Sequence, residues 1–120
     1  MDKILLTGVH LEVHAGVPED ERAVPQTVIV DVECERDLRP AGLSDDFART
    51  TDYSAVHRTL RDAATSRPYT LIEALAEVMA AAVLERFDVE SVRILIRKPA
   101  ALRAKKVDWA GVEIVRRRRA

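Results

Sequence analysis

An alternation of small apolar residues with mainly acidic ones between Thr27 and Leu38 constrains the fold more than any other feature of this chain. One set of alternate positions is small and apolar and comprises Val28, Val30, Val32 and Cys34. The intervening set is mainly acidic and comprises Ile29, Asp31, Glu33 and Glu35. Successive strand residues point to opposite faces, so the segment is predicted to be a long strand with one buried face. The chain must therefore build a sheet that covers a core on one side, and Cys34 is predicted to lie in that core.

The remaining segments follow either strand or helix spacing. Further strands are predicted at residues 4–13, 91–98 and 107–115, and Pro99 ends the strand at 91–98. Helices are predicted at residues 53–66, which Arg67-Pro68 ends, and at residues 70–87. The second helix would present the apolar stripe Leu71, Leu75, Met79, Val83 and Phe87. Residues 39–51 are predicted to be a polar loop.

The predicted element order is ββααββ, in which two hairpins flank a helical pair. This order indicates an α+β fold, with two helices on one face of an antiparallel sheet. The chain has 120 residues and neither an internal repeat nor a linker-like segment, so residues 1–120 are predicted to form a single domain. Four strands leave two open sheet edges, and open edges favour pairing with another subunit.

Composition argues against several classes of protein. The 19 basic and 20 acidic residues give a net charge of −1, which favours neither a nucleic-acid nor a membrane partner. No segment has the roughly 18 consecutive apolar residues that span a bilayer. The N-terminus lacks the pattern of a signal peptide. The single cysteine fits a reducing compartment, so we expect a cytoplasmic protein.

The residues that could carry acid–base chemistry are Glu21, Tyr53, Glu73 and Lys98. None of them belongs to a metal-binding or nucleophile motif, since the sequence contains no CxxC, G-x-S-x-G or P-loop. His10 and His14 would lie about 13 Å apart on a strand, which is too far to bind one ion. If the protein is an enzyme, these residues favour metal-free acid–base catalysis.

Four segments resemble, in order and at family spacing, the signature blocks of the dihydroneopterin aldolase family: LTGVHLEVHAGVPEDER, TTDYSAVH, TLIEALAEVMA and RILIRKPAA. The resemblance covers nearly the whole chain, from Leu5 to Arg116. It implies the tunnelling fold, in which subunits pair their sheets edge to edge into a tetrameric β-barrel and two barrels stack into a homo-octamer. It also implies active sites that lie between neighbouring subunits.

The activity that the resemblance implies is retro-aldol cleavage of 7,8-dihydroneopterin in folate biosynthesis. The products are 6-hydroxymethyl-7,8-dihydropterin and glycolaldehyde. Because the pterin ring itself accepts the electrons of the broken bond, the resemblance implies no cofactor, no metal ion and no Schiff base. Two alternatives stay open: a dihydroneopterin triphosphate 2'-epimerase of the same fold family, and a non-catalytic pterin-binding assembly subunit.

By the same resemblance, Glu73 anchors the pterin. A carboxylate can accept two hydrogen bonds from the 2-amino group and the adjacent ring nitrogen, which fixes the ring's orientation. Leu71 and Ile72 would add backbone contacts and an apolar wall. The sequence also permits a purely structural role for Glu73, because Thr70-x-x-Glu73 matches a helix capping box.

Lys98 continues the apolar face of its predicted strand. Its ammonium either extends along that face to water or is held at the end of the face for a functional role. The resemblance implies that Lys98 helps to protonate N5 of the pterin through a water molecule. Glu21 matches the family's loop glutamate near this lysine. The alternative for Glu21 is a solvated acidic loop, shared with Glu19 and Asp20.

Tyr53 matches a tyrosine that the neighbouring subunit contributes, where a phenol can move protons to and from hydroxyl groups. Asp52 and the adjoining backbone would line the neighbour's pterin pocket. The structural alternative is that Tyr53 packs on the sheet at the start of its helix.

Two basic segments fall outside these motifs. Arg103, Lys105 and Lys106 occupy a loop that departs from the family pattern, as either a solvated loop or a cationic rim for phosphorylated pterins. The run Arg116–Arg119 is predicted to be a solvated, partly frayed tail. The sequence leaves open the balance of aldolase and epimerase activity, the choice of tetramer or octamer, and the use of 7,8-dihydromonapterin.

Overall fold

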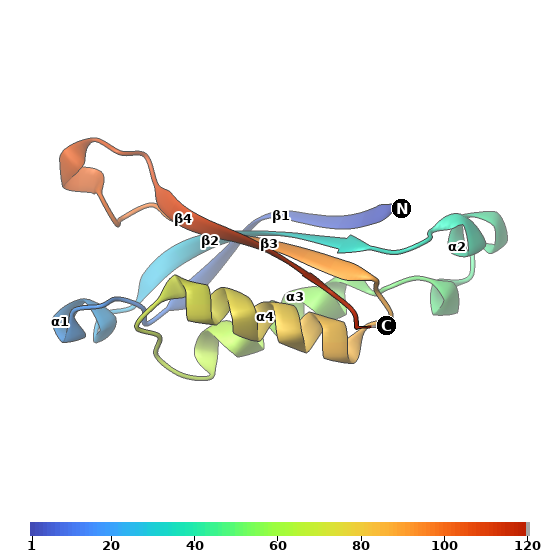
Figure 1. Ribbon diagram of the computed structural model, residues 1–120, viewed down its shortest axis with the longest axis horizontal. Helices are drawn as coiled ribbons and strands as arrows, with labels where there is room; N and C mark the ends of the chain where they lie inside the picture. The colour runs from blue at the N-terminus through green and yellow to red at the C-terminus, as the bar shows by residue number, and fades with distance from the viewer. Residues whose placement is uncertain (120) are drawn as a thin grey trace.

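The computed structural model describes residues 1–119, in which a four-stranded antiparallel sheet carries two long helices on one face (Figure 1). The elements in chain order are β1 (Lys3–Val13), α1 (Glu19–Arg22), β2 (Gln26–Glu35), α2 (Arg39–Ser44), η1 (Phe47–Arg49), α3 (Tyr53–Thr65), α4 (Ile72–Arg86), β3 (Ser91–Lys98), η2 (Arg103–Lys105) and β4 (Ala110–Arg117). The strands lie in the order β1-β2-β3-β4, so β1 and β4 form the two edges. This confirms the predicted α+β, ββααββ architecture.

The core lies between the sheet and the helix pair, and β2 runs through its centre. The four apolar positions of β2 from Val28 to Cys34 are at most 1% exposed, whereas the intervening positions are half-buried on the other face. Burial raises the pKa of the Cys34 thiol to about 11. The two helices add buried apolar side chains from their sheet-facing sides: Val56, Leu60, Ala63 and Ala64 from α3, and Leu75, Met79 and Val83 from α4.

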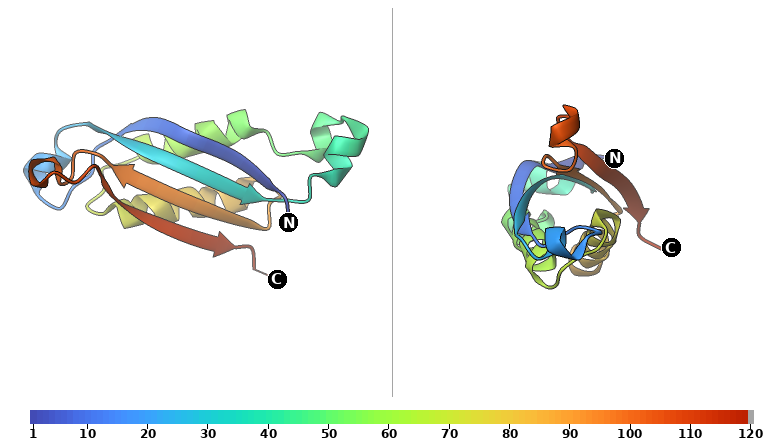
Figure 2. Two further views of the ribbon diagram at one scale, coloured as in Figure 1. Left: turned by 90° about the horizontal axis from the view of Figure 1, so that it is seen from above. Right: turned by 90° about the vertical axis from the view of Figure 1, so that its left-hand side faces the viewer.

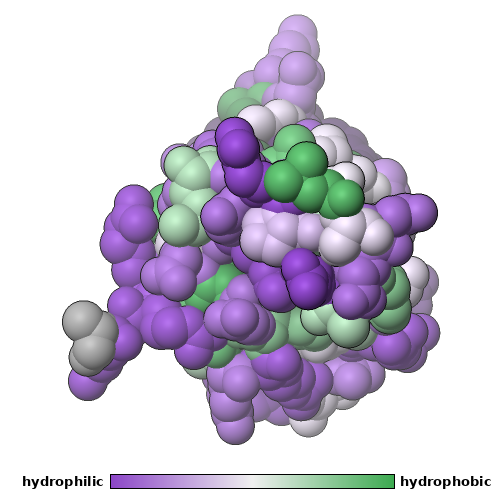
Figure 3. Space-filling model, turned by 90° about the vertical axis from the view of Figure 1, so that its right-hand side faces the viewer, coloured by the Kyte–Doolittle hydropathy of each residue, from purple (hydrophilic) through white to green (hydrophobic). Residues whose placement is uncertain are grey.

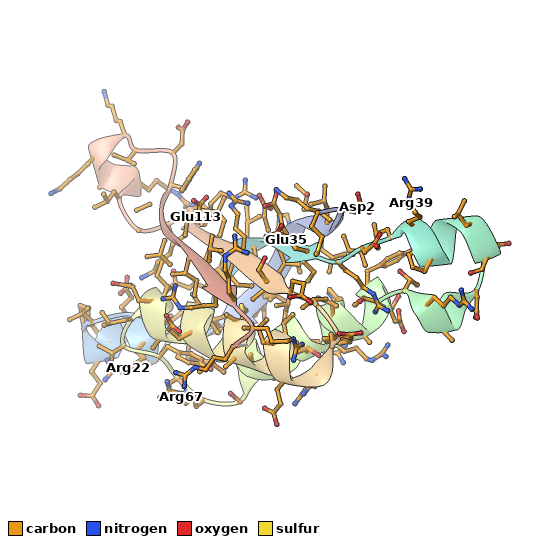
Figure 4. All side chains as sticks on the ribbon, turned by 45° about the vertical axis from the view of Figure 1, so that its right-hand side comes forward. Asp2, Arg22, Glu35, Arg39, Arg67 and Glu113 are labelled. Carbon is orange, nitrogen blue, oxygen red and sulfur yellow. The ribbon has the colours of Figure 1, made fainter. Side chains whose placement is uncertain are left out.

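The opposite, helix-free face of the sheet carries a network of ion pairs that crosses all four strands. Glu33 on β2 forms ion pairs with Lys3 on β1, at 3.5 Å, and with Arg93 on β3, at 3.8 Å. Arg93 also pairs with Glu113 on β4, which is labelled in Figure 4 together with Glu35. The hydroxyl of Ser91 donates to Glu35 and lowers the pKa of that carboxyl. The charges that alternate with the β2 valines therefore find partners on the neighbouring strands.

Several predicted boundaries differ from the structure. The segment 39–51 is not a simple loop, because it contains α2 and η1. Pro40 lies in the first turn of α2, where a missing N–H costs nothing, and the Asp46 carboxylate caps η1 by accepting from Ala48 N at 3.0 Å. Elements of three to six residues show no helical period, so spacing could not reveal them. The last strand covers Ala110–Arg117 rather than 107–115, and β2 ends at Glu35 rather than Leu38.

The arginine run 116–119 is exposed, as predicted, but most of it is ordered rather than frayed. Arg116 and Arg117 belong to β4, and Arg116 pairs with Glu77 on α4. The guanidinium of Arg118 donates to the backbone carbonyls of Leu84, Phe87 and Val89 at 3.0, 2.6 and 2.9 Å. A helix leaves its last carbonyls without partners within the helix, and a cation near them is favoured by the helix dipole. Arg118 therefore fixes the end of α4 to the edge of the sheet.

The two helices run antiparallel, which places their first turns at opposite ends of the elongated molecule. The chain measures 51 × 27 × 25 Å along its principal axes. α3 begins at the end that carries α2, whereas α4 begins at the other end, beside α1 (Figure 1). The twisted sheet wraps over both helices (Figure 2). Figure 3 views the α2 end, where apolar side chains lie exposed among hydrophilic ones. None of the helices in residues 1–119 has the length and apolar character needed to cross a membrane.

Candidate functional site

A cavity of about 430 Å³ lies where the first turn of α4 meets the β1–β2 connection and the β3–β4 end of the sheet. Five of the seven predicted site residues line it: Glu21, Leu71, Ile72, Glu73 and Lys98. Val17 and Val112 add apolar surface that the sequence did not single out. Two carboxylates and one ammonium therefore line the same hollow as several apolar side chains, a combination that suits a flat, polar-edged ring.

Lys98 and Glu21 form an ion pair within this cavity. Lys98 is the last residue of β3 and follows Ile94 and Ile96 on the buried face of the strand. Its Nζ lies 3.4 Å from Glu21 Oε1. The lysine side chain is only 13% exposed and that of Glu21 is 39% exposed, so the ammonium is held in place rather than extended into water. Glu21 is therefore not merely part of a solvated acidic loop.

Glu73 lies in the first turn of α4, and its side chain is exposed towards the cavity. The capping box that the sequence permits as an alternative does not form. The N-cap is Leu71, with φ −124° and ψ 136°, rather than Thr70, and no side chain caps this helix. Glu73 is consequently the second helical residue. With the capping role removed, the Glu73 carboxylate is available to a ligand and is favoured at this position by the helix dipole.

The loop that carries Val17 and Glu21 is fixed by hydrogen bonds to neighbouring segments. The backbone around Gly16 pairs with the segment before α4, since Gly16 N donates to Tyr69 O at 3.0 Å. Arg22, labelled in Figure 4, donates through Nη1 to the carbonyls of Gly16 and Val17 at 2.9 and 3.1 Å. Sequence reasoning missed Arg22, although it directly follows Glu21 in the first signature block.

Tyr53 and Asp52 lie away from this cavity, at the end where α3 begins. They line a second hollow of about 390 Å³ together with Ile4, Phe47, Thr50, Thr51 and Ser54. Asp52 caps α3 by accepting from Ser54 N at 2.9 Å. The Tyr53 side chain is 62% exposed, which contradicts the alternative in which it packs on the sheet. One chain therefore does not bring Tyr53 together with Lys98.

The basic loop after β3 gives no support to a cationic rim. Ala101 lines the main cavity, but Arg103, Lys105 and Lys106 do not. All three are exposed, on η2 or at its C-cap. Within residues 1–119 no three His, Cys, Asp or Glu side chains gather closely enough to hold a metal ion.

Together, the twisted antiparallel sheet and the helix pair on one face define a tunnelling-fold protein. The dihydroneopterin aldolase (FolB) family model matches residues 4–115. The chain belongs to the dihydroneopterin aldolase family.

Individual relatives agree with this assignment over nearly their full length. The dihydroneopterin aldolase of Methylorubrum extorquens is 40% identical over 98% of this chain and 91% of its own. That of Streptomyces coelicolor is 36% identical over 98% of this chain and 99% of its own. Among solved structures, E. coli dihydroneopterin aldolase in complex with neopterin matches with a TM-score of 0.91 and 30% identity, covering 97% of this chain and 99% of that chain.

Proposed function

We propose that this protein cleaves the trihydroxypropyl side chain of 7,8-dihydroneopterin, releasing glycolaldehyde and 6-hydroxymethyl-7,8-dihydropterin. The observation that carries the proposal is the meeting of Glu21, Glu73 and Lys98 in one cavity. Family membership supports the reaction, and in this proposal the three residues act as a ring anchor and an acid–base pair.

Glu73 anchors the pterin in this proposal. Its carboxylate accepts hydrogen bonds from the 2-amino group and the adjacent ring nitrogen, an arrangement that fixes the ring in one orientation. Leu71 and Ile72 lie beside it in the cavity lining, where they contact the ring. The ring edge that bears N5 and the side chain then faces Lys98.

Lys98 supplies the proton that the departing electrons require. Removal of the proton from the 2'-hydroxyl breaks the bond between C1' and C2' and turns C2' into the aldehyde carbon of glycolaldehyde. The electrons of the broken bond form a C1'=C6 double bond. The electrons of the C6=N5 imine move to N5, which takes a proton that Lys98 relays through water. Protonation of C1' and loss of the N5 proton then restore the imine. Glu21 holds the ammonium in position, as its 3.4 Å contact with Nζ allows.

Tyr53 acts from a neighbouring subunit in this proposal. Its side chain is exposed and lines a hollow of its own. Tyr53 is the first residue of α3, which begins at the end of the molecule opposite the start of α4 (Figure 1). Pairing of the β1 edge of one chain with the β4 edge of the next would close a barrel and satisfy both open edges. Such an assembly, a tetramer or an octamer of stacked barrels, joins the two halves of the site and places Tyr53 near the substrate hydroxyls.

Neither a metal ion nor a Schiff base is required in this proposal, because the pterin imine is the electron sink. A cytoplasmic location, for which the single cysteine is the argument, stays a prediction.

Product analysis tests the proposal directly. The oligomer is incubated separately with 7,8-dihydroneopterin and with its triphosphate, and products are separated by chromatography. Glycolaldehyde and 6-hydroxymethyl-7,8-dihydropterin are expected from the first substrate, with activity retained after exhaustive chelation and with no borohydride-trapped adduct on Lys98. Epimerised triphosphate without cleavage would instead identify the epimerase alternative. Binding of neopterin with no turnover would identify the non-catalytic subunit.

A further inference from the structure

Gly16 lies directly beneath the side chain of Glu21. A Cβ added at Gly16 would lie 2.6 Å from both Cγ and Cδ of Glu21 and closer still to its Oε1. These are the three nearest atoms that such a Cβ would meet. The φ angle of Gly16 lies outside the left-handed region, unlike that of Gly8. Its φ angle therefore does not require glycine, and what the structure requires at position 16 is the absence of a side chain.

Gly16 cannot retreat from an added side chain, because its peptide groups are held on both sides. Its N–H donates to Tyr69 O at 3.0 Å. Its carbonyl accepts from Arg22 Nη1 at 2.9 Å, and the same nitrogen donates to the carbonyl of Val17 at 3.1 Å. The Glu21 side chain, by contrast, is attached through rotatable bonds and is partly exposed. An added methyl group would therefore displace the carboxylate and leave the loop where it is.

We propose that Gly16 is a positioning residue, whose missing side chain lets the Glu21 carboxylate lie against Lys98. The hydrogen bonds from Arg22 to the carbonyls of Gly16 and Val17 keep the Gly16 backbone fixed against Glu21. The inference deepens the proposed function and rests on it for its kinetic consequences, because displacement of Glu21 removes the partner that holds the Lys98 ammonium at 3.4 Å. Pterin binding through Glu73 does not depend on this contact.

A double-mutant cycle tests the inference. Gly16→Ala, Glu21→Ala and the double variant are compared with wild type for kcat and KM with 7,8-dihydroneopterin, for the Kd of neopterin, and for unfolding in denaturant. Gly16→Ala is expected to lower kcat roughly tenfold or more, to the level of Glu21→Ala, while the Kd of neopterin changes less than about twofold. In the double variant the methyl group occupies the space that Glu21 has left, so it should match Glu21→Ala alone. Gly42→Ala is the control, because nothing lies within 4 Å of an added Cβ there, and it should behave as wild type.

Two results would overturn the inference: wild-type kcat in Gly16→Ala, or a loss of kcat from Gly16→Ala that is just as large when Glu21 is already alanine. If Gly16→Ala does not fold, the double variant is the test. It should fold, because Glu21 no longer occupies the space of the added methyl group. Failure of the double variant to fold would refute the contact. The unfolding measurements need no substrate. If wild type failed to cleave dihydroneopterin, the proposed function would be refuted. The contact would still be tested, because Gly16→Ala should change the free energy of unfolding less when Glu21 is already alanine.

Discussion

Replacement of Glu73 by glutamine separates ligand binding from helix stability in a single side chain. Glu73 is the second residue of α4 and makes no capping hydrogen bond, so the variant loses only the favourable position of a carboxylate near a helix N-terminus. For an exposed group that loss lies at the lower end of about 0.3–1 kcal/mol. We therefore expect the free energy of unfolding to change by less than about 0.5 kcal/mol.

Pterin binding should change much more in Glu73→Gln. A charge-assisted hydrogen bond contributes about 1.5–3 kcal/mol, which corresponds to a rise of about 10- to 150-fold in the Kd of neopterin. Titration calorimetry of the oligomer measures this Kd, and denaturant unfolding measures stability. Glu85→Gln, in the last turn of the same helix and outside the cavity lining, is the matched control and should bind neopterin as wild type does. A stability loss above about 1 kcal/mol with unchanged binding would refute the assignment of Glu73 as an anchor and restore a structural role.

Three further predictions concern other parts of the molecule. Tyr53→Ala and Lys98→Ala variants should each be inactive, and refolding them together should restore about a quarter of wild-type activity. In a randomly mixed ring, about a quarter of the shared sites receive Tyr53 from one subunit and Lys98 from its neighbour. No recovery despite verified mixing would place the site within one subunit. The Cys34 thiol should fail to react with Ellman's reagent at pH 8 in the native protein and react fully in denaturant, since burial and a pKa of about 11 lower its thiolate fraction about a hundredfold. Arg118→Ala should destabilise the protein by about 1 kcal/mol in denaturant unfolding, because the carbonyls at the end of α4 lose their hydrogen-bond donor. Arg119→Ala is the control and should not destabilise it. Equal effects would contradict the anchoring role of Arg118.

The fold could be predicted from the sequence because its determinants are periodic. The β2 alternation and the helical spacing of Val56 and Leu60 depend only on which face each residue presents, and both were confirmed. The start of α4 was missed for a tertiary reason. Threonine is a better N-cap than leucine, but Tyr69 pairs with the β1–β2 connection, and the chain stays extended through Leu71.

The candidate site was predicted from a resemblance in four short blocks, and the structure brings five of its seven residues to one cavity. The remaining two, Asp52 and Tyr53, lie elsewhere because α3 and α4 begin at opposite ends of the molecule. No spacing rule could have found the contact between Gly16 and Glu21, or the three carbonyls that Arg118 caps. Those contacts depend on how loops and chain ends fold back on the sheet.

The strict alternation along β2 also determines where the chain can tolerate a change in length. Insertion or deletion of one residue within β2 would exchange its two faces and move carboxylates such as Asp31 and Glu33 into the core. Each unpaired carboxylate in an apolar interior costs several kcal/mol, more than the marginal stability of a small domain can absorb. The connections at residues 36–52 and 99–109 carry no such constraint, because their residues are mostly exposed. Evolutionary gains and losses of residues should therefore concentrate in these two connections, and β2 should keep its length.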